Sequence, residues 1–302
     1  MVHALSIRFA AASLLLSIAT LVRAQEGRTK EGFSLAWDKK ITVVPDSISH
    51  GKHRLPAWTI AVFETDAGTV LDLWKNDMKT MSTALINGKP AYATGVRIAE
   101  VGEANTMFAS ATTDKKAKLA RLTVAFATSD STGTPNTSSQ EAYVRSLAVK
   151  YNRAVVQTQI ATYEKMLGKA GDKLSGTQED VAKNRQNITK ANSKLEKIKA
   201  KRGKVQGDIA HQQGDIAGLE KKFALTNATK DLEKLTKARG KLAKSESALA
   251  KLMQQEADVQ GDIAKYQGKL ESSTSEAEGR TATKNEVQRT VDALKRKHDA
   301  IN

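Results

Sequence analysis

The chain contains no cysteine and only four prolines among its 302 residues. Without thiols it can form no disulfide, no thiolate metal site and no lipid anchor on a cysteine. All four prolines lie at or before Pro135, so the last 167 residues contain none. Because a proline inside a helix costs about 3 kcal/mol, the second half of the chain is free to form uninterrupted helix.

Sequence patterns of catalysis are lacking as well. The chain has no Gly-x-Ser-x-Gly, no His-Glu-x-x-His and no phosphate-loop pattern. His50 and His53 stand close together, but no third ligand lies at a metal-binding spacing, so we interpret them as solvated loop residues. Acidic pairs such as Glu179 and Asp180 fall on a predicted rod that offers no concave pocket. We therefore expect a non-enzymatic protein with no cofactor and no metal.

Residues 1–24 have the pattern of a secretory signal peptide. Arg8 precedes an apolar run over residues 9–22, and Val22 and Ala24 suit cleavage before Gln25. The run is shorter than the ~20 apolar residues that a membrane span needs, although an uncleaved anchor remains the alternative. An exported chain without cysteine is more typical of bacteria than of disulfide-dense secreted domains. We expect a periplasmic or extracellular location, in a bacterium.

Residues 25–128 read as a small α+β domain, a sheet with one helix over it. The helix is expected over residues 67–82, with Asp66 as its N-cap. Residues 129–139, rich in Ser, Thr and turn formers, are expected to be a linker. The domain is predicted to fold without the rest of the chain. Strand-like runs cover residues 33–37, 41–44, 58–65, 92–101, 106–112 and 119–128.

A seven-residue apolar repeat runs through the second half of the chain and predicts a coiled coil. We expect one arm over residues 140–225, a turn at 226–229 and a second arm over 230–302. Asn227 tolerates a left-handed conformation, and Thr229 can cap a new helix. The repeat of the first arm is Ile160, Leu167, Leu174, Val181, Ile188, Leu195, Arg202, Ile209, Ile216 and Phe223. The repeat of the second arm is Ala228, Leu235, Leu242, Leu249, Glu256, Ile263, Leu270, Ala277, Lys284, Val291 and His298.

If the chain reverses at the turn, the arms form an antiparallel hairpin within one molecule. Residues whose numbers add to about 451 would then face one another, such as Ile188 and Ile263. The glycine-rich residues 168–176 would lie opposite 272–279, and weak helix propensity on both arms predicts a weak point near 272–283. Two chains pairing as a parallel dimer are the alternative, so a homo-oligomer stays open.

Positive charge is concentrated in the predicted coiled coil. Of the net charge of +15, residues 25–137 carry +2 and residues 138–302 carry +11. A basic block in the first arm is our candidate interaction surface, although such lysines also serve only as a solubilising face. Nucleic acid is a poor partner for an exported chain whose basic residues lack interleaved aromatics. The block consists of Lys190, Lys194, Lys197, Lys199, Lys201, Arg202 and Lys204.

In outline, a small sheet body with a long basic helical hairpin is similar to the tentacled periplasmic holdase chaperones. That resemblance implies binding of unfolded envelope proteins, although here the hairpin ends the chain instead of returning to add strands. From the residues we expect a structural or adaptor protein of the cell envelope, with the coiled coil as spacer or scaffold for envelope proteins. A holdase-type chaperone acting on unfolded clients is the alternative. A protein that binds an anionic surface polymer is the second alternative.

Overall fold

The computed structural model of the chain describes residues 28–29, 32–101, 105–129 and 131–302. The predicted signal peptide, residues 1–24, lies outside the described residues. The chain divides into two compact units. The first unit contains the described residues up to Leu167 together with Glu286–Asn302, and the second is Gly168–Asn285.

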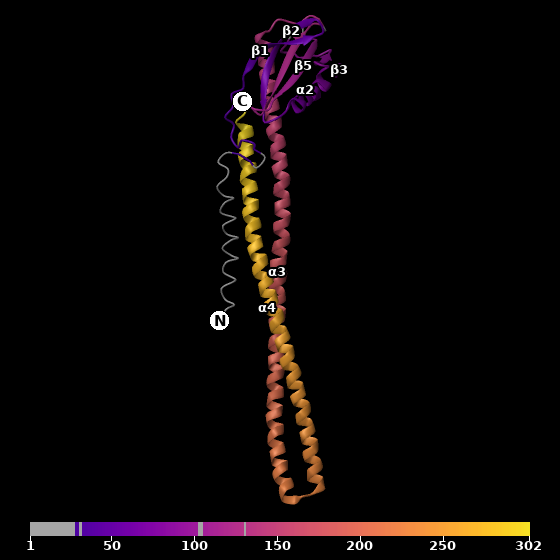
Figure 1. Cartoon of the computed structure of the whole chain (residues 1–302), viewed down its shortest axis with the longest axis vertical. Helices are drawn as coiled ribbons and strands as arrows, with labels where there is room; N and C mark the ends of the chain where they lie inside the picture. Colours follow the sequence, from indigo (N-terminus) through magenta and orange to yellow (C-terminus); the bar gives the residue numbers. More distant parts are fainter. Residues whose placement is uncertain (1–27, 30–31, 102–104, 130) are drawn as a thin grey trace. The chain divides into compact units, whose positions relative to one another are not determined.

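The first unit is built on one antiparallel sheet of six strands in the order β1-β2-β6-β5-β4-β3 (Figure 1). A single short helix, α2, connects β2 to β3. Two long helices, α3 and α4, follow the sheet and contribute their ends to this unit. The α+β class with a following helical hairpin is therefore confirmed. The elements are β1 (Val43–His50), β2 (His53–Phe63), α2 (Ala67–Met81), β3 (Ala84–Ile86), β4 (Ala91–Thr94), β5 (Thr106–Asp114), β6 (Leu119–Ala127), α3 (Ser138–Thr226) and α4 (Thr229–Asp299).

Helix α2 begins where its sequence predicts. The Asp66 side chain accepts a hydrogen bond from the Thr69 amide at 2.9 Å, which satisfies one of the free amides of the first turn. This bond lowers the pKa of the Asp66 carboxyl below its ordinary value. Val70, Trp74 and Met78, spaced by four residues, form the buried face of the helix.

The main core lies between one face of the sheet and the helices α2 and α3. Alternate residues of β6, such as Leu122, Val124 and Phe126, face this core because side chains alternate along a strand. The part of α3 within this unit contributes Val144, Leu147, Tyr151, Val155 and Ile160, and the end of α4 with the residues after it contributes Val291, Leu294 and Ile301. The helix ends are thus part of the same core as the sheet.

Residues 129–139 do not act as a free linker between two bodies. Ala127 and Gly133 form an isolated bridge, and the Asn136 side-chain amide donates to the Ala57 carbonyl at 3.2 Å. Helix α3 already begins at Ser138. Because the chain after this segment completes the core, the division of the molecule falls within the helices at residues 167 and 286 and not at residues 129–139.

The strand predictions were right for β5 and β6 and inexact elsewhere. Residues 33–37 contain only a bridge from Ser34 to Arg28, and β4 ends at Thr94 rather than continuing to residue 101. Strands β1 and β2 include Pro45 and Pro56, where the sequence suggested breaks. Proline is tolerated there because β1 is an edge strand and β2 pairs with β6 only from Ala57 onward.

His50 and His53 are strand residues rather than loop residues, although His53 is exposed as expected. They are paired with each other at the end of the β1–β2 hairpin. The His50 ring lies against Tyr92 and Phe108, with ring centroids 5.5 and 4.8 Å apart. These rings belong to the second face of the sheet, where a smaller cluster buries Ile48, Leu55 and Phe108.

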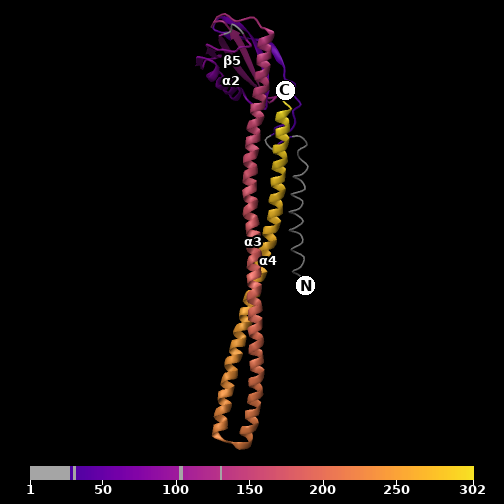
Figure 2. The same cartoon turned by 180° about the vertical axis from the view of Figure 1, so that it is seen from behind.

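The second unit is an antiparallel helical hairpin formed by residues 168–226 of α3 and 229–285 of α4 (Figures 1 and 2). The turn lies at Asn227 and Ala228, and Asn227 adopts the left-handed conformation with φ of 46°. Both features confirm the predicted turn at 226–229. Gly168, Gly171, Gly176 and Gly279 all lie within continuous helix, so low helix propensity does not interrupt either arm.

The register of the hairpin differs from the predicted one by a few residues. Arg202 pairs with Glu256, and the Arg280 guanidinium donates to the Lys173 carbonyl at 2.8 Å, so the facing residue numbers add to 458 and 453 instead of 451. The apolar phase of the two arms was correct, but it does not determine which layers of the two arms face one another. The turn and the charged contacts select the observed register.

Candidate functional site

The predicted basic block lies on the exposed surface of the second unit. Its six lysines are exposed, whereas Arg202 is half-buried. Arg202 pairs with Glu256, a carboxylate whose side chain is only 10% exposed, and Lys199 pairs with Glu196 in the same helix. Within the described residues, no ion pair involves Lys190, Lys194, Lys197, Lys201 or Lys204. These five ammonium groups are therefore available to a partner.

Arg202 and Glu256 explain why each arm has a charged residue in its apolar repeat. In the observed register the two charges face one another, flanked by the buried cluster of Leu195, Ile198 and Val259. Breaking such a pair leaves an uncompensated charge, so the pair favours this register over those that would place Arg202 against an apolar residue. Arg202 therefore belongs to the packed seam of the hairpin, and only the exposed lysines of the basic block remain as the candidate interaction surface.

Three lysines of the block border a narrow hollow between the two helices. Lys194, Lys197 and Lys201 line it from α3, with Ile198 at its floor. Gln255 and Asp258 line it from α4. Three positive charges against one carboxylate make this hollow electropositive, which suits a small anion or an acidic side chain.

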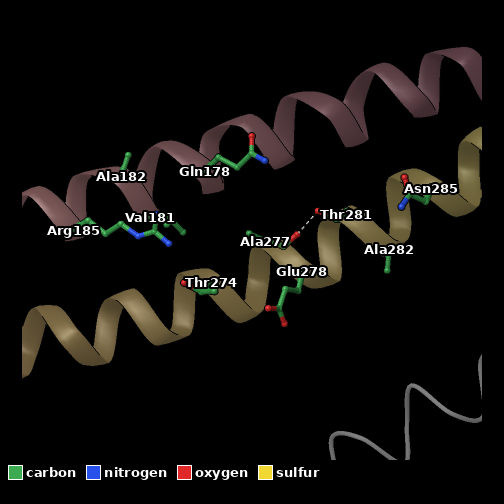
Figure 3. Close-up of a pocket in the computed structure, with 10 residues that line it drawn as sticks. All are labelled: Gln178, Val181, Ala182, Arg185, Thr274, Ala277, Glu278, Thr281, Ala282 and Asn285. Atoms are coloured by element: carbon green, nitrogen blue, oxygen red, sulfur yellow. Dashed lines mark hydrogen bonds between the residues drawn. The ribbon is translucent and has the colours of Figure 1, made fainter.

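A larger groove of about 600 Å³ opens where the predicted weak point of the second arm lies (Figure 3). Val181 and Arg185 extend from α3 toward α4, and Ala277 faces α3 (Figure 3). Because the facing residues Thr274, Ala277 and Thr281 are small, they leave the space between the helices unfilled. Weak helix propensity near 272–283 therefore marks a packing defect and not a break in the helix.

The first unit contains a buried polar network that the sequence did not indicate. The Lys297 ammonium, with its side chain 2% exposed, pairs with the Glu64 carboxylate and donates to the Ser34 carbonyl at 2.9 Å. The Gln159 amide also donates to Glu64 at 3.0 Å. Four segments that are distant in sequence meet here, so no local pattern could have revealed the network.

Two further contacts join the helices of the first unit. The Arg153 guanidinium donates two hydrogen bonds to the Ile301 carbonyl, at 3.1 and 2.7 Å. The Tyr151 hydroxyl donates to Asp77 of α2 at 3.0 Å, and burial raises the pKa of this phenol, with Asp77 adding to the effect. The end of the chain therefore lies beside α3, at Arg153.

Neither metal binding nor membrane spanning finds support in the part of the chain that the structure describes. There, no group of three or more His, Asp or Glu side chains is placed to hold a metal ion. None of the described helices has the length and apolar character needed to cross a bilayer. The chain matches no protein-family model, and it matches no curated protein.

Proposed function

We propose that the protein is a non-enzymatic, exported structural or adaptor protein of the cell envelope, whose helical hairpin serves as spacer and interaction scaffold. The observation that carries this proposal is the hairpin of the second unit. Residues 168–226 alone form about 88 Å of helix at 1.5 Å per residue. Its seam buries apolar and paired residues, while unpaired lysines cover its surface.

The helix ends within the first unit support a spacer role. Both helices have one end in this unit, where the buried Lys297 and the exposed Arg153 contribute polar contacts that hold the end of the chain. Both strands of the hairpin therefore continue from one folded core. Such an element suits a protein that holds partners apart.

The proposed export is supported by the signal-peptide pattern of residues 1–24 and by the absence of cysteine. Expression of the full chain in a bacterial host should yield a processed protein outside the cytoplasm. N-terminal sequencing is expected to begin at Gln25. An unprocessed protein that stays in the cytoplasm would contradict the proposed location.

Partner capture from the native envelope tests the scaffold role. We expect the wild type to retain an envelope protein in a fixed ratio, and Lys194→Glu with Lys197→Glu to lose it because both lysines border the electropositive hollow. Lys115→Glu with Lys116→Glu, two exposed lysines of the first unit, is the matched control. Equal loss in both variants would show that the basic block has no specific role.

A holdase-type chaperone is the second candidate, and the groove between Val181 and Ala277 is the observation that favours it. An open, largely apolar groove with Arg185 and Glu278 in its lining can accept unfolded chains that carry apolar and charged residues. Suppression of the aggregation of an unfolded client, without a stoichiometric partner, would favour this function. The exposed lysines of the basic block make an anionic surface polymer a third partner to test in the capture experiment.

A further inference from the structure

The turn between α3 and α4, at the end of the hairpin (Figure 1), carries exposed leucine side chains. Leu225 is 87% exposed and Leu232 is 45% exposed, and Leu225 is the most exposed large apolar residue among those that the structure describes. The seam at this end is closed by Leu235, which is 5% exposed, and by the half-buried Phe223. Leu225 therefore adds almost nothing to the hairpin core, and Leu232 leaves nearly half of its surface outside it.

The turn that presents these leucines is held by a compact set of hydrogen bonds. The Thr226 hydroxyl donates to Asp231 at 2.9 Å, and the Asn227 amide donates to the Phe223 carbonyl at 2.9 Å. The Asp231 side chain is 9% exposed and also pairs with Lys222 at 3.6 Å. These bonds fix the backbone on both sides of the turn, next to Leu225.

Lysines surround the exposed leucines. Residues 221–234, which we call the tip, contain four lysines against Asp231 and Glu233. Lys222 pairs with Asp231, whereas no ion pair within the described residues involves Lys221, Lys230 or Lys234. The tip therefore combines a protruding apolar group with uncompensated positive charge.

We propose that the tip is a contact site for an anionic lipid surface, with Leu225 and Leu232 entering the interfacial region and the lysines contacting headgroups. Amphipathic segments bind membranes by this combination of apolar insertion and attraction to anionic lipid. A stable protein–protein interface buries about 800 Å² on each partner, which a turn with two exposed leucines does not supply. A bilayer needs no matching shape.

This inference deepens the proposed spacer function and rests on it, because it names what one end of the hairpin contacts. Its test is independent of export, since binding to vesicles is measured on purified protein. We would use the chain from Gln25 onward, which retains every described residue and removes the apolar residues 9–22 that would bind lipid themselves. Failure of processing in cells would leave the vesicle result unchanged.

Co-sedimentation with vesicles is the first experiment. The wild type should bind vesicles of equal parts phosphatidylglycerol and phosphatidylcholine, and phosphatidylcholine alone only weakly. Leu225→Ser with Leu232→Ser should weaken binding about tenfold or more, because both lose apolar area that enters the bilayer. Met253→Ser, which removes another exposed apolar side chain of the hairpin, is the matched control and should bind like the wild type.

Lysine substitutions at two places distinguish lipid contact at the tip from lipid contact along the side of the hairpin. Lys221→Gln with Lys230→Gln should weaken binding by about fivefold for each lysine removed, whereas Lys194→Gln with Lys197→Gln removes the same charge from the basic block and should have a much smaller effect. Equal loss in both variants would place the lipid contact along the helices and overturn the tip. Wild-type protein that binds neither kind of vesicle would also overturn the proposed lipid contact, and a partner protein would then be the ligand to test at the tip.

Discussion

A single lysine near the end of the chain is expected to contribute strongly to stability. Lys297 is almost fully buried and pairs with Glu64, so Lys297→Met would leave a carboxylate without its counter-charge. Removing one partner of a buried pair costs about 3–5 kcal/mol, and chemical denaturation should show a loss of that size. Lys295→Met is the control, because the exposed pair of Lys295 with Glu164 should contribute little.

The double variant Glu64→Gln with Lys297→Met distinguishes charge from shape. If the cost of Lys297→Met arises from the unpaired Glu64 carboxylate, the neutral amide should recover part of the lost stability. No recovery would mean that the hydrogen bonds of Lys297 to the Ser34 carbonyl and to Gln159 matter more than its charge.

The N-cap of α2 predicts a pH-dependent contribution. Asp66→Ala should destabilise the protein by about 1 kcal/mol near neutral pH, because the Thr69 amide loses its acceptor. The pKa of Asp66 is lowered in the fold, so its stabilisation is complete above the ordinary value of 3.8 and is lost as the pH falls through the lowered pKa. Thermal unfolding at a series of pH values should show the difference between wild type and Asp66→Ala shrinking in acid.

Asp66→Asn provides the matched control for that experiment. Asparagine caps helices about as well as aspartate but carries no titrating group. Its stability should therefore lie close to that of the wild type near neutral pH. A difference between wild type and Asp66→Ala that does not change in acid would contradict the assignment of this effect to the carboxylate.

Individual elements were predictable where apolar residues recur at a single, regular spacing. The apolar heptads from Ile160 to Val291 indicated the two helices, and Asn227 with Thr229 located the turn. The predicted register was wrong by a few residues, because the apolar heptads do not determine which layers of the two arms face one another. The strands at Pro45 and Pro56 were cut short because the position of a strand at a sheet edge is a tertiary property that no local pattern encodes.

The candidate sites were only partly accessible from the sequence. Counting charges found the basic block, but its division into a paired Arg202 and free lysines depends on the register. Weak helix formers near residues 272–283 indicated an irregularity where the groove near Ala277 lies, but not the groove itself. The exposure of Leu225 was not predicted. Whether an apolar residue beside a turn is exposed depends on which of its neighbours pack into the seam, and the sequence does not show this.

The register of the hairpin can be tested by cross-linking, because the chain has no cysteine of its own. Ile198→Cys with Val259→Cys joins two members of one buried cluster and should form a disulfide within a monomer under oxidising conditions. The pair Ile188→Cys with Ile263→Cys, taken from the predicted register, should react more slowly, because Ile263 packs against the cluster that contains Ile198. Non-reducing gels distinguish the products, and a dominant dimer from Ile198→Cys alone would contradict the intramolecular hairpin.

At the scale of the whole molecule, the sheet and the helix ends form one core, and this determines which parts of the chain fold alone. Ending the chain after Ser138 would expose the sheet face that Val144, Leu147 and Tyr151 cover. Each such side chain contributes about 1.5–3 kcal/mol when buried, so losing these three costs about 5–9 kcal/mol, which is comparable with the roughly 5–15 kcal/mol that stabilise a typical domain. The shared core therefore argues against the expectation that residues 25–128 fold without the rest of the chain.

A paired deletion tests this argument. Replacing residues 168–285 by a short Gly/Ser loop keeps the described residues up to Leu167 together with Glu286–Asn302, which form one compact unit, and retains Lys297 with its partners Glu64 and Gln159. This shortened chain should unfold cooperatively, as followed by near-ultraviolet circular dichroism and urea titration, whereas the chain ending at Ser138 should be insoluble or molten. Cooperative unfolding of the chain ending at Ser138 would show that the sheet and α2 suffice. The helix ends would then be an addition to a complete domain, and the boundary would return to residues 129–139.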